Sequence, residues 1–245
     1  MCRGELCSPM GVRRAPLQFI GMQLKFIEIM EKEKIAGLYI HIPFCIKKCN
    51  YCDFYSLGGN NAVSDEYVDA VLHEIRKYSD MQWKTVYFGG GTPSLLTPQQ
   101  VGRILREISV LPDSEITLEA NPETVALQIL QGFRQTGVNR ISFGVQTANR
   151  QSLKTLGRIH SNQKVTEAFE NAKKAGFTNI SGDVMLGLPD YTYEELDETV
   201  QLLSDLGATH ISSYMLKIEQ GTPFAKNTPA NIPDDDKMSD FYLYA

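Results

Sequence analysis

The stretch Gly37-Leu-Tyr-Ile-His-Ile-Pro-Phe-Cys-Ile-Lys-Lys-Cys-Asn-Tyr-Cys52 joins a strand-like run to three closely spaced cysteines. Residues 37–42 are rich in β-branched and aromatic side chains, which favours a β-strand. Cys45, Cys49 and Cys52 follow this run directly. Clustered cysteines in a chain without a recognisable secretion signal are typical of metal binding or catalysis rather than of a disulfide framework. The pattern therefore predicts a metal site just after the first strand.

Strand-like and helix-like segments alternate along the rest of the chain. Helical spacing of apolar residues and capping-box patterns, Thr97 with Gln100 and Thr192 with Glu195, mark the helices. Strands separated by helices favour parallel pairing through right-handed crossovers, with functional residues at the carboxyl ends of the strands. About six such units predict an α/β fold, an open and partial (β/α)6 barrel. The expected strands are 37–42, 85–88, 115–119, 140–144, 180–186 and 210–216, and the expected helices are 64–78, one opening at 97, 124–135, 161–175 and 192–206.

Composition and length narrow the classes of function. The chain has 245 residues, 42% of them hydrophobic, and a formal net charge of -5. A mildly acidic surface gives no reason to expect nucleic-acid binding. No apolar run approaches the roughly 20 residues that a membrane-spanning helix needs. We expect a cytoplasmic protein, since a reducing compartment keeps cysteine thiols available.

We divide the chain into three parts. Residues 1–36 are a leader of uncertain structure, in which Met22 or Met30 is the expected natural start. Scattered polar and acidic residues in this leader argue against a secretory or organellar targeting segment. Residues 37–226 form the predicted core domain. Residues 227–245 are predicted to be a linker and the start of a truncated C-terminal domain, because the chain stops inside a helix-like stretch.

Three thiolates on one short loop can ligate three irons of a 4Fe-4S cluster and leave the fourth iron without a protein ligand. The amine and carboxylate of the methionine end of S-adenosyl-L-methionine could chelate that open iron. A zinc site is the alternative, but structural zinc prefers four ligands, often from two C-x-x-C elements. The sequence has no second pair of that kind. The spacing favours the cluster.

Polar and glycine residues follow the later strands. Gly90 and Gly91, in Gly89-Gly-Gly-Thr-Pro93, would let a ligand approach the backbone closely, although a glycine run is more often a plain turn. Glu119, Gln146, Arg158 and Asp183 lie in, at or beyond the third to fifth strands and could bind a nucleoside and an amino acid. An internal ion pair between Arg158 and Asp183 is the alternative.

Taken in order, these motifs resemble the oxygen-independent coproporphyrinogen III oxidase family, which uses radical S-adenosylmethionine (SAM) chemistry. The resemblance extends over residues 37–224. It is carried by Tyr39-Ile-His-Ile-Pro-Phe-Cys45, Cys49, Tyr51-Cys52, Tyr87-Phe-Gly-Gly-Gly-Thr-Pro93, Glu119-Ala-Asn-Pro122, Gly144-Val-Gln146, Leu156-Gly-Arg-Ile-His160 and Asp183-Val-Met-Leu-Gly-Leu-Pro189.

The resemblance implies a role for each matching residue. Cys45, Cys49 and Cys52 would hold the 4Fe-4S cluster. Contacts to the SAM bound on the cluster are implied for Tyr39, Gly90 and Glu119. Contacts to a second SAM, or a role in shaping that pocket, are implied for Tyr51, Gly91, Thr92, Gln146, Arg158 and Asp183.

One position separates two branches of the family. The oxidases carry a further cysteine two places after the third one, whereas this chain has Phe54 there, in Cys52-Asp-Phe-Tyr-Ser56. That form resembles the heme chaperone (HemW) branch, which implies a protein that binds and transfers heme. The alternative is an enzyme that decarboxylates coproporphyrinogen III to protoporphyrinogen IX through a 5′-deoxyadenosyl radical. Implied partners are heme or a porphyrinogen, a one-electron donor such as a flavodoxin or ferredoxin, and heme-accepting respiratory proteins.

Overall fold

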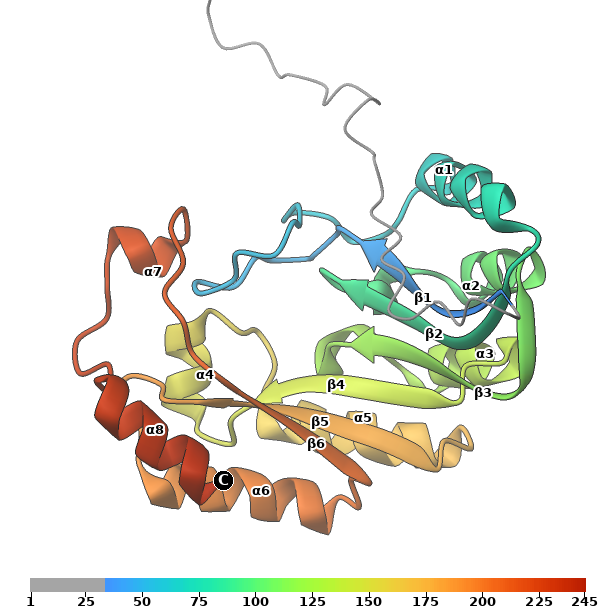
Figure 1. The fold of residues 1–245 in the computed structure, drawn as a ribbon. Helices are drawn as coiled ribbons and strands as arrows, with labels where there is room; N and C mark the ends of the chain where they lie inside the picture. The colour runs from blue at the N-terminus through green and yellow to red at the C-terminus, as the bar shows by residue number, and fades with distance from the viewer. Residues whose placement is uncertain (1–33) are drawn as a thin grey trace, which may run out of the picture.

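The computed structural model describes residues 34–245, which form one curled sheet of six parallel strands (Figure 1). The strands lie in chain order, and each pairs in parallel with the next. The chain begins the sheet at β1 and ends it at β6, so in this part of the chain the barrel stays open between those two edges. The strands are β1 Ile35–Ile42, β2 Gln82–Gly90, β3 Ser109–Ala120, β4 Arg140–Gln146, β5 Asn179–Leu186 and β6 His210–Met215.

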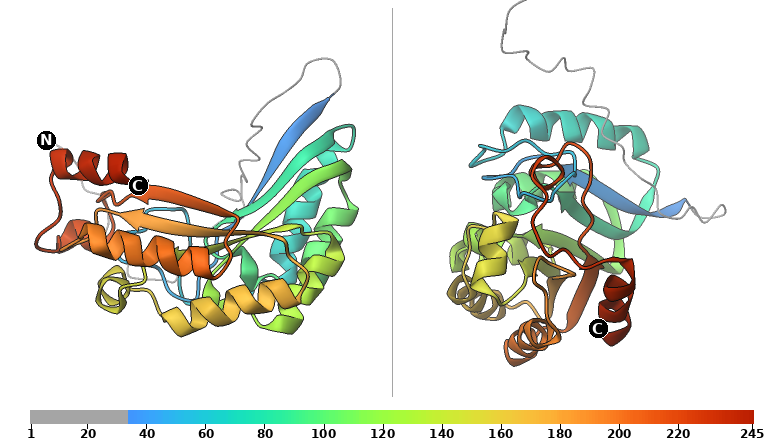
Figure 2. Two further views of the ribbon diagram at one scale, coloured as in Figure 1. Left: turned by 90° about the horizontal axis from the view of Figure 1, so that it is seen from below. Right: turned by 90° about the vertical axis from the view of Figure 1, so that its left-hand side faces the viewer.

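Helices cover the outer face of the curled sheet (Figure 2). Each of the five crossovers that join these six strands contains at least one helix, as the alternation of segments predicts. The predicted α/β architecture, an open partial (β/α)6 barrel, is confirmed. The helices are α1 Asp65–Ile75, α2 Pro98–Arg106, α3 Leu127–Thr136, α4 Arg150–Leu156, α5 Asn162–Lys174, α6 Tyr193–Asp205, α7 Pro223–Lys226 and α8 Asp235–Tyr244, with short 3-10 turns at Arg76–Tyr78, Pro93–Leu95 and Pro122–Thr124.

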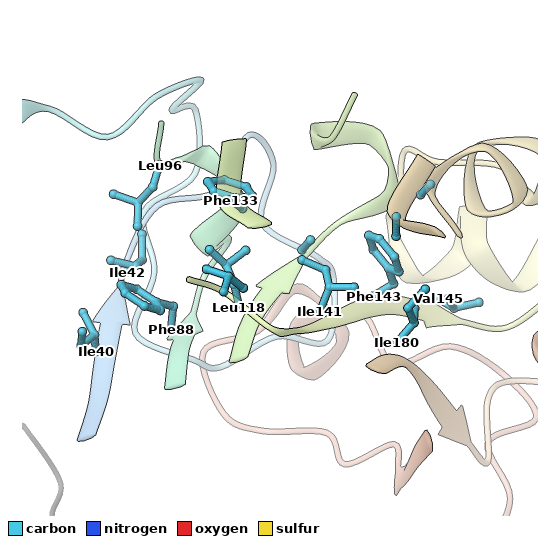
Figure 3. Close-up of a cluster of buried hydrophobic side chains, with 14 of the residues drawn as sticks. Ile40, Ile42, Phe88, Leu96, Leu118, Phe133, Ile141, Phe143, Val145 and Ile180 are labelled. Carbon is cyan, nitrogen blue, oxygen red and sulfur yellow. The ribbon is translucent and has the colours of Figure 1, made fainter. Parts of the chain in front are cut away.

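The strands bury one set of alternate residues against the helices. Ile40, Phe88 and Leu118 are fully buried in this layer (Figure 3). Because side chains alternate between the two faces of a strand, their neighbours Tyr39 and Glu119 point into the barrel. The hydrophobic layer therefore sets which polar residues face the interior, where a ligand would lie.

Two predicted capping boxes have different outcomes. At α2 both halves form: Thr97 Oγ1 accepts from the Gln100 amide, and the Gln100 side chain accepts from the Thr97 amide. At α6 Thr192 Oγ1 accepts from the Glu195 amide, but the Glu195 carboxylate accepts a hydrogen bond from Thr147 Oγ1 at 2.6 Å. The prediction of a capping box at α6 is half right, because a tertiary contact draws the carboxylate away.

The region between β4 and α5 differs from the prediction. The expected strand ended at 144 and the next expected helix began at 161, with a longer loop predicted between them, whereas the structure has the short helix α4 there. Asn149 Oδ1 caps it by accepting from the Gln151 and Ser152 amides, and Gly157 ends it with φ of 78°. A seven-residue helix is too short to leave a clear periodic pattern. α4 matters for the site because Arg158 follows it.

The last helix packs on the barrel body. The Phe241 ring of α8 lies 4.9 Å from the Tyr191 ring and 4.8 Å from the Tyr193 ring, between ring centroids. The assignment of residues 227–245 to a further domain stays a prediction, and the predicted start at Met22 or Met30 lies outside the described residues. In residues 34–245 we find no helix that is long and apolar enough to span a membrane.

Candidate functional site

The three cysteines lie on one loop, residues 43–60, which follows β1. This cysteine loop is closed by its own backbone: the Cys45 amide donates to the Leu57 carbonyl at 2.9 Å, and the Asn60 amide donates to the Cys45 carbonyl at 3.0 Å. The Cys52 amide donates to the Cys49 carbonyl in a turn. All three thiols are free, with Cys45 buried and the other two half-buried. The predicted metal ligands are therefore held together at the carboxyl edge of the barrel.

Asn50, between the second and third cysteines, fastens this loop to two other segments. Its amide and its side-chain Nδ2 donate to the carbonyls of Leu156 and Thr155, each at 2.9 Å. Its own carbonyl accepts from the Phe224 amide at 3.0 Å. A Cβ on Gly157 would lie 3.1 Å from the Asn50 side chain, so the glycine allows this close approach. The loop is thus attached to the end of α4 and the start of α7.

Glu119 points into the barrel with both carboxylate oxygens engaged. Oε1 accepts from the Tyr87 hydroxyl at 2.7 Å, and Oε2 accepts from the Gly90 amide at 3.1 Å. Burial raises the pKa of Glu119 to about 7, and the charge of Asp183 adds to the rise against these two hydrogen bonds. A carboxyl group poised near neutrality would be driven to its ionised form by a cationic ligand.

Tyr39 connects the interior of β1 to the cysteine loop. Its hydroxyl lies 3.0 Å from His41 Nδ1, and His41 Nε2 lies 2.7 Å from the carbonyl of Tyr55. A neutral His41 that donates from Nε2 and accepts at Nδ1 satisfies both contacts. Burial, with the charge of Glu119, raises the pKa of Tyr39 to about 12, so the phenol stays protonated.

The glycine run has a structural reason that the sequence does not reveal. Gly90 has φ of 116°, and a Cβ there would lie 2.7 Å from the His41 ring. A Cβ on Gly91 would lie 2.7 Å from the Phe44 carbonyl oxygen and 3.0 Å from Cys45 Sγ. Packing of β2 against the cysteine loop thus explains both glycines. Their predicted contact with a ligand stays a prediction.

Arg158 follows the end of α4 and contacts the cysteine loop. Its Nη2 donates to Asn121 Oδ1 at 2.6 Å and to the Gly144 carbonyl at 2.7 Å, and its Nη1 lies 3.5 Å from Cys49 Sγ. The alternative ion pair with Asp183 does not form among the described residues; Asp183 accepts from Ser142 Oγ at 3.1 Å instead. The guanidinium is therefore directed at the cysteine loop.

The remaining predicted residues also face this end of the barrel. Gln146 is buried with φ of 71°, and its Oε1 accepts from the Tyr214 hydroxyl. Tyr214 also hydrogen-bonds to Tyr51, whose own pKa is raised by burial. Thr92 is buried, and its Oγ1 accepts from Asn121 Nδ2 at 3.2 Å. Hydrogen bonds thus connect these predicted residues to side chains from other strands and loops at this end of the barrel.

Residues 39–203 match the model of the Radical SAM superfamily. This chain belongs to that superfamily. Membership implies a 4Fe-4S cluster and SAM as cofactors. The described part of the chain fits such a cluster in its donor chemistry: three free thiols on one loop, with a buried guanidinium beside Cys49. No three His, Cys, Asp or Glu side chains within residues 34–245 converge on a single metal ion, whereas a cluster takes its thiolates on separate irons.

Curated proteins with similar sequences are named heme chaperones. The chain is 39% identical to the heme chaperone HemW of Escherichia coli over 222 residues, which are 87% of this chain and 58% of that protein. It is 36% identical to HemW of Lactococcus lactis over 219 residues, 86% of this chain and 58% of that protein. The chain thus spans little more than half the length of these curated relatives.

A solved structure shows the same architecture. Coproporphyrinogen III oxidase (HemN) from Escherichia coli, described as a radical SAM enzyme, has a TM-score of 0.75 to this chain at 27% identity. The match covers 85% of this chain and 50% of HemN. Methylornithine synthase, with a TM-score of 0.59 at 13% identity, shows the fold alone.

The sequence prediction of this radical SAM site missed several supporting residues. Tyr87 and Asn121 stand inside quoted motifs without a role, and Asn50 and Tyr214 were not singled out. Tyr87 could have been found, because period-two alternation on β2 places it on the same face as Gly89. Asn50 could not, because its partners lie more than a hundred residues away on α4 and α7.

Proposed function

We propose that Cys45, Cys49 and Cys52 ligate a 4Fe-4S cluster whose open iron binds SAM inside the barrel. When bound and reduced, such a cluster supplies the electron that cleaves the sulfonium of SAM and generates a 5′-deoxyadenosyl radical. The observation that carries the proposal is the position of the three free thiols. They share one loop at the carboxyl edge of the barrel, where radical SAM family membership calls for a cluster.

Glu119, Gly90 and Tyr39 are proposed to contact the SAM on the cluster. The amine of the methionine end is a cation near neutral pH, and the Glu119 carboxyl, with a pKa of about 7, can pair with it once ionised. Tyr39 supplies a neutral hydroxyl, since its pKa is raised to about 12. Because the Gly90 amide already donates to Glu119, this strand end positions the carboxylate.

The other residues named by the family resemblance are proposed to shape the adjacent pocket or to contact a second SAM. Several of them are already held by hydrogen bonds to neighbouring side chains, as the Thr92–Asn121 and Gln146–Tyr214 bonds show. Polar side chains held in place by such hydrogen bonds can fix the orientation of a ligand. The set comprises Tyr51, Gly91, Thr92, Gln146, Arg158 and Asp183.

We propose that the whole protein is a heme chaperone that binds and transfers heme. Two observations support this function over an oxidase: curated relatives at 36–39% identity are named heme chaperones, and Phe54 stands where the oxidase pattern has a cysteine. Phe54 is 63% exposed on the cysteine loop. The proposed partners are heme, a one-electron donor such as a flavodoxin or ferredoxin, and heme-accepting respiratory proteins in a reducing compartment.

The second candidate is a coproporphyrinogen III dehydrogenase-type oxidase. The structural similarity to HemN favours it, since the TM-score of 0.75 extends over 85% of this chain. The two candidates share the proposed cluster and SAM site and differ in what is done with a tetrapyrrole. A fold and a cofactor do not decide the substrate.

An anaerobic assay on the reconstituted chain separates the two candidates. Reductant, SAM and coproporphyrinogen III are added, and mass spectrometry follows 5′-deoxyadenosine and protoporphyrinogen IX. In parallel, heme is titrated and its Soret absorption recorded. The heme chaperone proposal expects saturable heme binding and no protoporphyrinogen IX. Protoporphyrinogen IX formed together with 5′-deoxyadenosine would establish the oxidase and reject the chaperone.

A further inference from the structure

The guanidinium of Arg158 is held by protein groups on both of its terminal nitrogens. Nη2 is shared between Asn121 Oδ1 and the Gly144 carbonyl, and Nη1 lies within hydrogen-bond distance of Cys49 Sγ at 3.5 Å. A Cβ on Gly144 would lie 3.0 Å from Nη2, so the absent side chain makes room for the guanidinium. Of the three guanidinium nitrogens, Nε is buried and has no partner within residues 34–245. The contact with sulfur is thus part of a fixed arrangement.

Arg158 follows α4 and Cys49 lies on the cysteine loop, and backbone hydrogen bonds join these two segments. The Arg158 amide donates to the Leu153 carbonyl at 2.9 Å, which closes the end of α4. The Asn50 amide, next in sequence to Cys49, donates to the Leu156 carbonyl of the same helix at 2.9 Å. Cys49 therefore cannot move away from Arg158 without breaking the junction between the cysteine loop and α4.

Arg158 carries a full positive charge in this setting. The guanidinium of an arginine keeps its proton in proteins, and here its N–H groups face an amide oxygen, a carbonyl and a sulfur. The nearby Glu123 carboxylate has Oε2 3.4 Å from His160 Nδ1. The sulfur of Cys49 therefore has a permanent cation as its neighbour rather than a neutral donor.

We propose that Arg158 is a positioning residue that raises the reduction potential of the cluster through its hydrogen bond to the Cys49 thiolate. The inference rests on the proposed ligation by Cys49. One-electron reduction adds a negative charge to the cluster and increases the electron density on its thiolate sulfurs. A hydrogen bond to sulfur and an adjacent positive charge stabilise that reduced state more than the oxidised one. This role is compatible with the pocket role proposed for Arg158 above, because Nε and the second N–H of Nη1 have no partner among the described residues.

A redox titration of the reconstituted chain, without SAM, measures the effect. The electron comes from dithionite through mediators, and electron paramagnetic resonance (EPR) counts reduced clusters. With Arg158→Met we expect the ratio of reduced to oxidised cluster at a fixed potential to fall about tenfold, which is about 59 mV for one electron. Arg158→Lys keeps the charge and should fall in between. Arg150→Met, at an exposed arginine of α4, is the matched control and should leave the ratio within twofold.

A second measurement needs no destabilised variant. Wild-type protein labelled with [¹⁵N]arginine should show a weak ¹⁵N coupling to the reduced cluster by pulsed EPR, and Arg158→Lys should lose it. An unchanged potential in a fully loaded Arg158→Met protein, or no ¹⁵N coupling in the wild type, would overturn the inference while leaving the cluster assignment intact. Wild-type protein that assembles no cluster would overturn the ligation by Cys49 and the inference with it.

Discussion

Replacing Glu119 by glutamine should change how the stability of the cofactor-free protein depends on pH. Burial raises the pKa of Glu119 from 4.5 to about 7. The fold therefore favours the protonated carboxyl, and its contribution to stability is complete below the unfolded-state value. That contribution is lost as the pH rises through about 7. A glutamine side chain cannot ionise, so the Glu119→Gln variant should not lose stability in this way.

The size of the effect follows from the pKa difference between the folded and unfolded states. One pKa unit corresponds to about 1.4 kcal/mol. The wild type should thus lose up to about 3 kcal/mol of unfolding free energy between pH 4.5 and 8 through this group. The glutamine can accept from the Gly90 amide through its oxygen and donate to the Tyr87 hydroxyl through its nitrogen. Any cost of this rearrangement should not vary with pH.

Urea unfolding of both proteins at several pH values between 4.5 and 8 gives the comparison, since titrations of other groups cancel in the difference. Glu123→Gln is the matched control. Burial raises the pKa of Glu123, but the contact with His160, 3.4 Å away, and the charge of Arg158 outweigh burial and give a lowered pKa. The difference in unfolding free energy between Glu123→Gln and the wild type should not vary with pH above 5 and should change only in acid. Parallel curves for Glu119→Gln and the wild type would refute the reasoning.

Two further substitutions test the packing. Gly90→Ala should destabilise the protein by over ~1 kcal/mol more than Gly176→Ala, because both glycines have positive φ but only at Gly90 does a Cβ meet the His41 ring. Phe133→Ala, at a fully buried ring, should cost about 3–5 kcal/mol, whereas Phe54→Ala should stay within about 0.5 kcal/mol. Urea unfolding measures all four; equal losses within either pair would contradict the packing described.

Local patterns predict most of the fold. The alternation of strands and helices gives the six-stranded parallel sheet, and the capping residue Thr97 marks the start of α2 correctly. Boundaries are less predictable: β3 extends from Ser109 to Ala120, whereas the expected strand was 115–119. α3 begins at Leu127, after a 3-10 turn at Pro122–Thr124. The added residues pair with a neighbouring strand or form a short turn, and neither leaves a periodic signal.

Contacts across the site depend on strand register, which a single sequence does not reveal. Tyr39 and Tyr87 are register partners on β1 and β2, and Glu119 lies opposite Ser142 on β4. The motifs identify residues of these strands but not which side chains meet. The bond from Arg158 to Cys49 depends in addition on α4, which the sequence did not predict.

The central claim is that Cys45, Cys49 and Cys52 hold a 4Fe-4S cluster with one iron open to SAM. EPR of the anaerobically reconstituted, dithionite-reduced chain, recorded with and without SAM, tests it most directly. We predict a reduced-cluster signal that changes when SAM is added, and no signal in the variant with all three cysteines replaced by alanine. A triple variant that keeps its full iron and sulfide content, or a wild-type signal indifferent to SAM, would contradict the claim.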